Sequence, residues 1–237
     1  MIRAIIWMGY FWIYLVFTFV DMIKVKWLER QNKIAERDAF IHKRAMEWAK
    51  KMVAFTGSKI TVTGEENIPK EGGVLFVGNH QSNFDIPILI GYINKPKAFI
   101  TKSELSRVPI FSTWMKAIGC IFINRKNARQ SLIAINQGAE RLKQGYSIVI
   151  FPEGTRSQDG SVGEFKAGSL KLATKSKVPI IPVTIKGSMN IMPKKGFVIR
   201  PAAVEVIISP PVMIDPAIKN DSNQISEIVR NIIISQL

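Results

Sequence analysis

The sequence has few of the residues that build disulfides and metal sites. Its 237 residues include one cysteine, Cys120, and two histidines, His42 and His80. A single cysteine excludes a disulfide within the chain, and two histidines leave no cluster of metal ligands. A reducing location that faces the cytosol fits this composition best. Cys120 lies in the apolar run 120–123, so we expect it to be a buried small residue and not a nucleophile.

The chain also lacks the signatures of two functional classes. It has no Gly-x-Ser-x-Gly elbow of the kind found in serine hydrolases. It has no nucleic-acid-binding module pattern either, because its aromatic residues gather in the N-terminal segment and do not interleave with a basic patch. Positive charge is abundant, however, with a net charge of +15, which predicts an anionic partner. Charge alone leaves open a bilayer surface, a phosphorylated or acidic-protein substrate, and nucleic acid.

Residues 4–20 form a nearly unbroken apolar run. At roughly 17 residues, the run is at the short end for a membrane span. A secretory signal is disfavoured, because the run is rich in aromatics and no small-residue cleavage site follows it. Two interpretations remain. One is a single span with its C-terminal side cytoplasmic, in agreement with the stronger Lys/Arg flank on that side. The other is a helix that dips into one leaflet.

Residues 24–55 contain no proline or glycine. Their apolar positions recur at helical spacings, which predicts one long amphipathic helix with a basic opposite face. Such a helix is typical of an in-plane membrane anchor, and the alternative is a surface helix packed on the domain. We expect His42, among charged neighbours, to be solvated or interfacial and without a chemical role. The predicted organisation is a membrane-associating helical segment at 1–57, followed by a domain at 58–237.

Short apolar runs beyond Gly57 alternate with helical patterns. We expect strands at 59–63, 73–77, 98–100, 121–123, 147–151, 179–185 and 204–208. We expect helices at 86–92, 110–118, 130–142, 167–175 and 223–234. This alternation predicts an α/β domain with a mixed, largely parallel sheet flanked by helices.

The first polar loop after a predicted strand, Asn79–Asp85, contains a histidine and a carboxylate five positions apart. If the backbone turns between them, His80 can act as a base and Asp85 can fix its tautomer. The alternative is that Asp85 only caps the helix that begins at Ile86, with His80 as a plain loop residue.

Two further loops carry basic and acidic residues at strand ends, where sites assemble in sheets of this kind. One places an arginine just after the strand at 121–123, and the other is the turn Pro152–Ser157. An arginine beside the amides of a glycine turn suits a phosphate or a carboxylate. A glutamate in that turn can bind a substrate hydroxyl or hold the arginine. Taken singly, each loop is also a normal surface turn. The candidate binding residues are Lys102, Arg125, Glu153, Gly154, Thr155 and Arg156.

Four motifs in this order resemble those of the glycerolipid acyltransferases with a His-x4-Asp motif, the family of the 1-acylglycerol-3-phosphate acyltransferases. They are His80-x4-Asp85, Gly119–Arg125, Phe151–Ser157 and Val178–Val183. The resemblance covers residues 58–210, and Phe-Pro-Glu-Gly-Thr-Arg-Ser downstream of His-x4-Asp makes it highly specific. The N-terminal helices also agree with the bacterial members.

The resemblance implies transfer of an acyl chain from acyl-CoA or acyl-ACP to the sn-2 hydroxyl of lysophosphatidic acid, giving phosphatidic acid in phospholipid biosynthesis. His80, oriented by Asp85, would remove the hydroxyl proton. Arg156 and Glu153, with Arg125 and Lys102, would hold the glycerol phosphate. A backbone amide or an ordered water would stabilise the oxyanion. We expect no covalent acyl-enzyme, no metal and no cofactor beyond the acyl donor.

The expected partners are therefore an anionic membrane surface, lysophosphatidic acid and the acyl donor, with no nucleic acid. The expected location is the cytoplasmic face of the inner membrane. One alternative is an acyltransferase with another acceptor, such as glycerol 3-phosphate, another lysophospholipid or a lyso-aminolipid. A remote alternative is a basic protein that binds membranes or nucleic acid without chemistry, for which His80 and Asp85 would be dispensable and salt would abolish binding.

Overall fold

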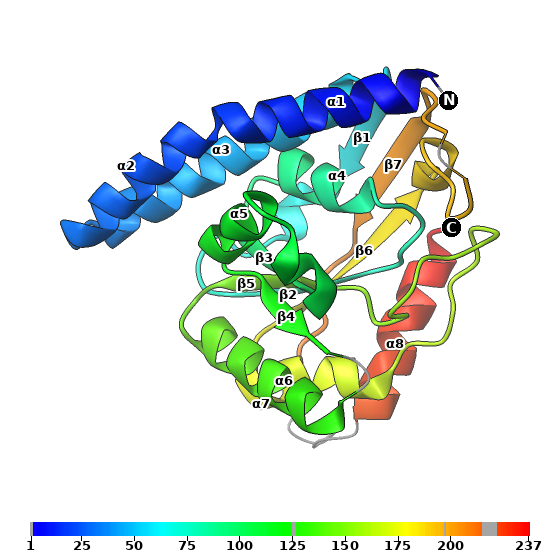
Figure 1. Ribbon diagram of the computed structural model, residues 1–237. Coiled ribbons are helices and arrows are strands. Elements are labelled where there is room, and N and C mark those ends of the chain that lie inside the picture. Colours follow the sequence, from blue (N-terminus) through cyan, green and yellow to red (C-terminus); the bar gives the residue numbers. More distant parts are fainter. Residues whose placement is uncertain (1, 125–126, 197, 215–221) are drawn as a thin grey trace.

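A computed structural model describes residues 2–124, 127–196, 198–214 and 222–237 (Figure 1). Within these residues, seven strands form one sheet in the order β1-β7-β6-β2-β5-β3-β4. All neighbouring strands are parallel except β6 and β7, which are antiparallel. The strands are β1 Lys59–Thr63, β2 Leu75–Gly78, β3 Lys97–Lys102, β4 Ile121–Ile123, β5 Ser147–Ile150, β6 Ile180–Lys186 and β7 Ala203–Ile208.

Helices cover both faces of the sheet (Figure 1). The α-helices of this domain are α4 Asp85–Tyr92, α5 Phe111–Ile118, α6 Ala128–Lys143, α7 Lys171–Ser176 and α8 Ser222–Ser235. Shorter 3₁₀ turns occur at η1 Glu65–Asn67, η2 Ser103–Arg107, η3 Ala167–Leu170 and η4 Ser188–Asn190. The predicted mixed, largely parallel sheet flanked by helices is confirmed. The helix expected at 167–175 differs in detail, because it is divided into η3 and α7.

Strand β2 shows why the central strands read as unbroken apolar runs. Phe76 packs into the core under α3 and α4, whereas Leu75 and Val77 pack into the core over α6, α7 and α8. Alternate side chains of a strand point to opposite faces, and here both faces are buried. The strand ends at Gly78, and the polar loop that follows it leaves the sheet at its centre.

Three helices precede the sheet: α1 Ile2–Phe17, α2 Phe19–Arg30 and α3 Ile34–Ala54. The expectation of one continuous helix over 24–55 is wrong, because the chain reverses at 31–33, where Asn32 adopts a φ of 54°. Asparagine tolerates this left-handed conformation better than most residues do. The reversal brings α2 against α3, where Met22 and Val25 share an apolar cluster with Ile41. An ion pair between Arg44 and Asp21, at 2.6 Å, also joins the two helices.

Helix α3 packs on the domain, since Ala45, Ala49 and Val53 are buried in the core that it shares with α4. The surface-helix alternative therefore describes α3.

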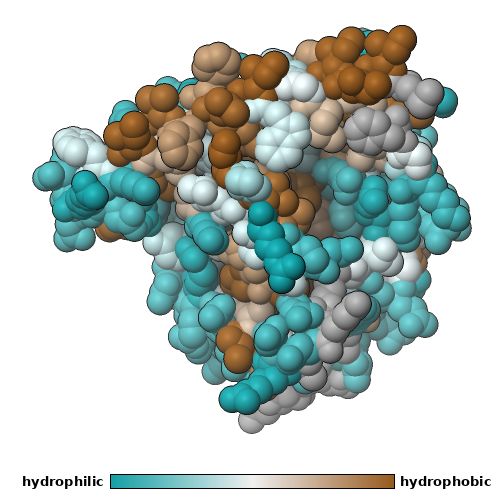
Figure 2. Space-filling view, viewed as in Figure 1, coloured by the Kyte–Doolittle hydropathy of each residue, from teal (hydrophilic) through white to brown (hydrophobic). Residues whose placement is uncertain are grey.

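Helices α1 and α2 lie along the outside of the domain and leave an apolar face uncovered (Figures 1 and 2). Residues Ile2–Arg30 are long and apolar enough to cross a membrane by length and composition, with a turn at Thr18. One side packs inward, through Ala4 and Leu15 among others. The exposed apolar side chains of this segment are Ile2, Ile5, Ile6, Trp12, Ile13, Val16, Phe17, Phe19, Val20, Ile23 and Trp27. We call these eleven residues the apolar face.

Candidate active site

The candidate site lies at the carboxyl end of β2, between the ends of its neighbours β5 and β6. Asn79, the first residue beyond β2, is buried and bonds the backbone of β6 with both ends of its amide. Its Nδ2 donates to Ile185 O at 2.9 Å, and Ile185 N donates to its Oδ1 at 2.8 Å. A side chain thus continues the pairing of β2 with β6 where the chain turns away. This fixes the start of the loop that carries His80.

His80 and Asp85 are in contact, with 2.7 Å between Nδ1 and Oδ2. The same carboxylate oxygen accepts the backbone N–H groups of Gln81 at 2.7 Å and Ser82 at 2.9 Å. Asp85 is the first residue of α4 and is fully buried, yet its side chain bonds back into the loop. The alternative of Asp85 as only a helix cap therefore fails. With the carboxylate as acceptor, Nδ1 of His80 donates and Nε2 is left to act as a base.

Ser188 completes the surroundings of Asp85 and was not among the residues expected from sequence. Its hydroxyl is buried and donates to Oδ1 of Asp85, the oxygen that the histidine does not use. Ser188 begins η4, just beyond the end of β6. The rule that identified the other loops, polar residues after the carboxyl end of a buried strand, applies equally to Gly187-Ser188 and could have found it.

Glu153 is buried beneath the loop, and it holds the backbone. Its Oε1 accepts His80 N at 2.8 Å, and its Oε2 accepts Gly163 N at 3.1 Å. Burial raises the pKa of this carboxyl group, and the two N–H donors act in the opposite direction. Glu153 was expected to bind substrate or to hold Arg156. The structure instead gives both of its oxygens backbone partners, so we assign it the positioning of His80.

The segment after β5 also holds the imidazole itself. The ring of Phe151 stacks on His80, with 4.2 Å between centroids and 14° between planes. Ser157 N donates to His80 O at 2.7 Å. Gly154 turns the chain between these two contacts with a φ of 72°, a conformation that favours glycine. Contacts at the ring face and at Nδ1 thus fix the imidazole, and hydrogen bonds to the N–H and C=O groups of His80 fix its backbone.

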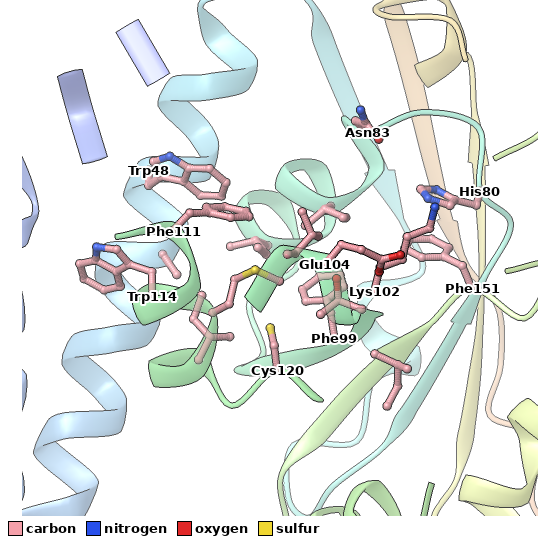
Figure 3. Close-up of a pocket in the computed structure, with 18 of the residues that line it drawn as sticks. Trp48, His80, Asn83, Phe99, Lys102, Glu104, Phe111, Trp114, Cys120 and Phe151 are labelled. Atoms are coloured by element: carbon pink, nitrogen blue, oxygen red, sulfur yellow. The ribbon is translucent and has the colours of Figure 1, made fainter. Parts of the chain in front are cut away.

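A cavity of about 440 Å³ extends from His80 into the apolar core, and we call it the His80 cavity. His80, Phe151 and Lys102 lie at one end, and Trp48, Phe111 and Trp114 at the other (Figure 3). Between the ends the lining is mainly apolar, from α4, β3 and α5. Cys120 also lines the cavity, and burial raises the pKa of its thiol to about 11. A thiol that stays protonated is a poor nucleophile.

The structure brings most of the predicted site residues together. Lys102, Gly154, Thr155 and Arg156 line the His80 cavity with His80, whereas Asp85 and Glu153 are buried behind it. Arg125 lies outside the described residues. Lys194, which follows η4 by four positions, lines the same cavity and adds a cation that sequence reasoning missed. It belongs to a Lys-Lys-Gly turn with no strand before it, so the strand-end rule did not apply.

This arrangement suits one kind of chemistry. A neutral imidazole with an available Nε2 can take a proton from a hydroxyl group. Cationic side chains around it, Lys102, Arg156 and Lys194, can hold an anionic head group, and the apolar interior can take a long hydrocarbon chain. The arrangement can therefore accommodate an amphiphilic molecule that carries an anionic group, a hydroxyl group and a hydrocarbon chain.

Comparisons with known proteins agree with this geometry. The sequence profile described as Acyltransferase matches residues 59–186. A probable 1-acyl-sn-glycerol-3-phosphate acyltransferase of Mycoplasma pneumoniae is 44% identical over 59% of this chain and 53% of its own length. A 1-acyl-sn-glycerol-3-phosphate acyltransferase of Borreliella burgdorferi is 33% identical over 76% of this chain and 72% of its own. The chain thus spans about half of the first relative and over two thirds of the second.

A solved structure is similar over nearly the whole chain. The crystal structure of the 1-acyl-sn-glycerophosphate (LPA) acyltransferase from Thermotoga maritima matches with a TM-score of 0.83 and 30% sequence identity. The match covers 99% of this chain and 96% of that one, so it includes the N-terminal helices.

Proposed function

Because this chain belongs to the Acyltransferase family, we propose that it acylates lysophosphatidic acid at the sn-2 hydroxyl to give phosphatidic acid, with acyl-CoA or acyl-ACP as donor. The relatives named above support the acceptor. The observation that carries the proposal is the 2.7 Å contact between His80 Nδ1 and Asp85, at the cationic end of an apolar cavity.

The reaction begins when Nε2 of His80 removes the proton of the sn-2 hydroxyl. The resulting oxygen attacks the thioester carbon, and the tetrahedral intermediate expels the thiolate of the donor. His80 then returns its proton to that sulfur, so no group of the protein is changed at the end. Asp85 stabilises the imidazolium that exists between the two transfers. Ser188 and the amides of Gln81 and Ser82 keep Asp85 in place.

The phosphate of the acceptor is held by Arg156 and Lys102, with Lys194 as a further contact. We retain Arg125 in this set from the sequence motif alone. A fixed phosphate places the hydroxyl near Nε2, and positioning of this kind accounts for much of the rate of a two-substrate reaction. Gly154 and Thr155 supply backbone and hydroxyl groups in the same turn.

The acyl chain occupies the apolar length of the His80 cavity. Ala45, Ile90 and Ile118 line it on the side that backs onto a second cavity. The length of acyl chain that fits depends on how far the cavity extends, and these residues set that limit.

The apolar face of α1 and α2 docks the protein on a membrane, at the cytoplasmic side of the inner membrane. One side of these helices packs on the domain along its length, through Ala4, Leu15, Met22 and Leu28, while the other is apolar and exposed. A helix that is packed in this manner lies in the interface more readily than it spans the bilayer. The net charge of +15 favours an anionic surface.

An acceptor panel tests the proposal directly. Purified protein is given one labelled acyl thioester, once as the CoA and once as the carrier-protein form. The acceptors are lysophosphatidic acid, glycerol 3-phosphate, a neutral-headgroup lysophospholipid and a lyso-aminolipid. We expect transfer to lysophosphatidic acid, lost by at least about a thousandfold in His80→Ala. Transfer only to another acceptor would select that alternative. No transfer to any acceptor, with full membrane binding, would favour a binding protein.

A further inference from the structure

A second cavity, of about 350 Å³, lies at the amino ends of the parallel strands, whereas His80 lies at their carboxyl ends. It is lined by the first residues of β3 and β5, by the segment before β2, and by α3 and α6. We call it the Lys97 cavity. Among the described residues, its lining includes five Lys and Arg side chains against two carboxylates, those of Asp38 and Glu71. The lining is therefore cationic, at a place where the proposed reaction needs no charge.

Two of these cations are deeply buried lysines. Lys97 is 7% exposed and Lys95 is 9% exposed. Lys97 Nζ donates to Leu89 O at 2.9 Å and Ile93 O at 2.8 Å, and Lys95 Nζ donates to Pro69 O at 2.7 Å and Lys70 O at 3.2 Å. An ammonium group has three N–H bonds. Among the described residues, each lysine therefore has one more donor than the acceptors found for it.

Carbonyl groups do not fully compensate these buried charges. Burial lowers the pKa of Lys97 to about 7, and it lowers the pKa of Lys95 as well, despite opposing effects of Glu65 and Glu71. A nearby anion would favour the charged form of both lysines.

Arg141, on α6, supplies a third donor. Its guanidinium lies over the ring of Tyr146, 5.0 Å from the centroid. Its Nε is buried and has no hydrogen-bond partner in the described part of the chain. Arg37, at the other side of the cavity, differs because Asp38 and Glu29 both bind it. Lys70, the fifth cation of the lining, is exposed. The buried or half-buried side chains left to bind a ligand are thus Lys95, Lys97 and Arg141.

We propose that the Lys97 cavity binds a phosphate-bearing anion, with Arg141, Lys95 and Lys97 as donors to its oxygens. Three charge-assisted donors from separate elements suit an anion with several oxygens. The volume exceeds that of a bare phosphate, and Ile41, Ile90 and Tyr146 offer an apolar wall for the organic part of a phosphate monoester.

This anion is distinct from the acceptor phosphate of the proposed reaction. His80 follows the carboxyl end of β2, whereas Lys97 and Ser147 begin β3 and β5. Ala45, Ile90 and Ile118 line both cavities and form the wall between them. The Lys97 cavity is therefore a separate anion site, on the other side of the wall from the proposed acyl chain.

Phosphate binding by the full chain in detergent tests the proposal. Labelled inorganic phosphate is the probe, in an Arg156→Ala background that weakens the acceptor site. We expect one saturable site, weakened at least tenfold by Arg141→Met and by Lys95→Met. Lys143→Met, on the same helix but exposed, is the matched control and should bind normally. Glycerol 3-phosphate and a nucleoside monophosphate as competitors distinguish free phosphate from an organic monoester.

Two outcomes would overturn the proposal. One is no saturable binding at millimolar phosphate in the Arg156→Ala background, and the other is binding by both Met variants as tight as in that background. If those variants do not fold, lysine-labelling mass spectrometry on the unaltered sequence decides. Saturating phosphate should protect Lys95 and Lys97 from acylating reagent and leave Lys143 unchanged. Equal labelling with and without phosphate would also contradict the proposal.

Discussion

The side chain of Asp85 lies in a place without solvent, and four donors bind it. The imidazole of His80 and the amides of Gln81 and Ser82 bind one oxygen, and Ser188 binds the other. A buried carboxyl group without partners would be costly, so these donors stabilise it and fix its direction. The orientation of His80 depends on this set, because Asp85 is its partner at Nδ1.

Ser188→Ala should reduce kcat about tenfold and leave KM for the acceptor within about twofold. A hydrogen bond to a charged group contributes about 1.5–3 kcal/mol, and its loss frees Asp85 to rotate away from His80. Steady-state kinetics on lysophosphatidic acid measures this split. Thr184→Val is the matched control, because Thr184 is another buried hydroxyl of the same β6 segment and donates to Ile233 O, away from the site. Equal loss of kcat in both variants would show that Ser188 is only structural.

The sequence was informative about residues whose partners are near in the chain. His80 and Asp85 are five positions apart, and the strand before them, the turn between them and the helix start could be predicted from nearby residues. Ser188 reaches Asp85 from 103 positions away. The strand-end rule could have marked Ser188 as a candidate, but its partner depends on the β2–β6 pairing, which no local pattern predicts. The contacts of Glu153 were not predicted for a related reason. Its motif has the composition of a binding turn, but the direction of the carboxylate depends on the neighbouring loop.

At the scale of elements, hydrophobic periodicity predicted most strands and helices within one or two residues, because both faces of the sheet are buried. It failed at 31–33. Gln31, Asn32 and Lys33 are compatible with a helix, and only the packing of α2 against α3 explains the reversal there. Propensity is a weak guide where tertiary contacts decide.

Helix α4 connects the two cavities, with Asp85 at its first turn and Lys97 bonded to the carbonyls of Leu89 and Ile93 near its end. The folded protein holds the pKa of Lys97 near 7, well below its ordinary value, so between pH 7 and about 10 the unfolded state binds more protons. The free energy of unfolding should therefore rise with pH in this range, by up to about 1.4 kcal/mol per unit from this group.

Lys97→Met should remove that slope. Thermal unfolding of both proteins in phosphate-free buffer from pH 6 to 10 measures it, and the difference in Tm isolates Lys97 from other titrating groups. We expect the stability of the Lys97 protein relative to the Met variant to increase above pH 7 and to be flat below it. A constant difference at every pH would contradict the assigned effect of burial.

The wall between the two cavities should determine acyl-chain length. Ile118→Ala enlarges the His80 cavity at this wall, and Ala45→Leu reduces it. Each additional buried methylene contributes about 0.8 kcal/mol, so a donor two carbons longer should gain about tenfold in relative kcat/KM with Ile118→Ala. Ala45→Leu should shift the preference in the opposite direction. Competition between two donor lengths measures the ratio.

Leu105→Ala is the control for the wall variants, because Leu105 lines the His80 cavity but not the Lys97 cavity. It should leave the chain-length ratio unchanged. A shift with Leu105→Ala equal to that with Ile118→Ala would mean that cavity volume in general, and not this wall, sets the length.

At the scale of the whole molecule, the apolar face and the His80 cavity lie on opposite sides of the N-terminal helices. Tyr14, Leu15 and Thr18 line the cavity from the inner side of the N-terminal helices, whose outer side carries the apolar face. Trp114 Nε1 donates to Thr18 at 3.2 Å, which ties the bend of these helices to α5. The N-terminal helices therefore form the layer between the cavity and the apolar face.

Phe17→Asp combined with Val20→Asp should weaken membrane binding at least tenfold without unfolding the protein. These side chains are 77% and 68% exposed at the bend of the apolar face, so the change removes inserted apolar area and adds charge that the hydrocarbon excludes. Met213→Asp is the matched control, because Met213 is an apolar residue outside these helices and is 66% exposed.

Co-sedimentation with anionic and neutral vesicles at low and high salt separates the contribution of apolar insertion from that of charge. Insertion should survive high salt in the unaltered protein and in Met213→Asp, whereas the double variant should keep only a salt-sensitive interaction with anionic vesicles. Unchanged binding of the double variant would mean that charge alone holds the protein on the membrane.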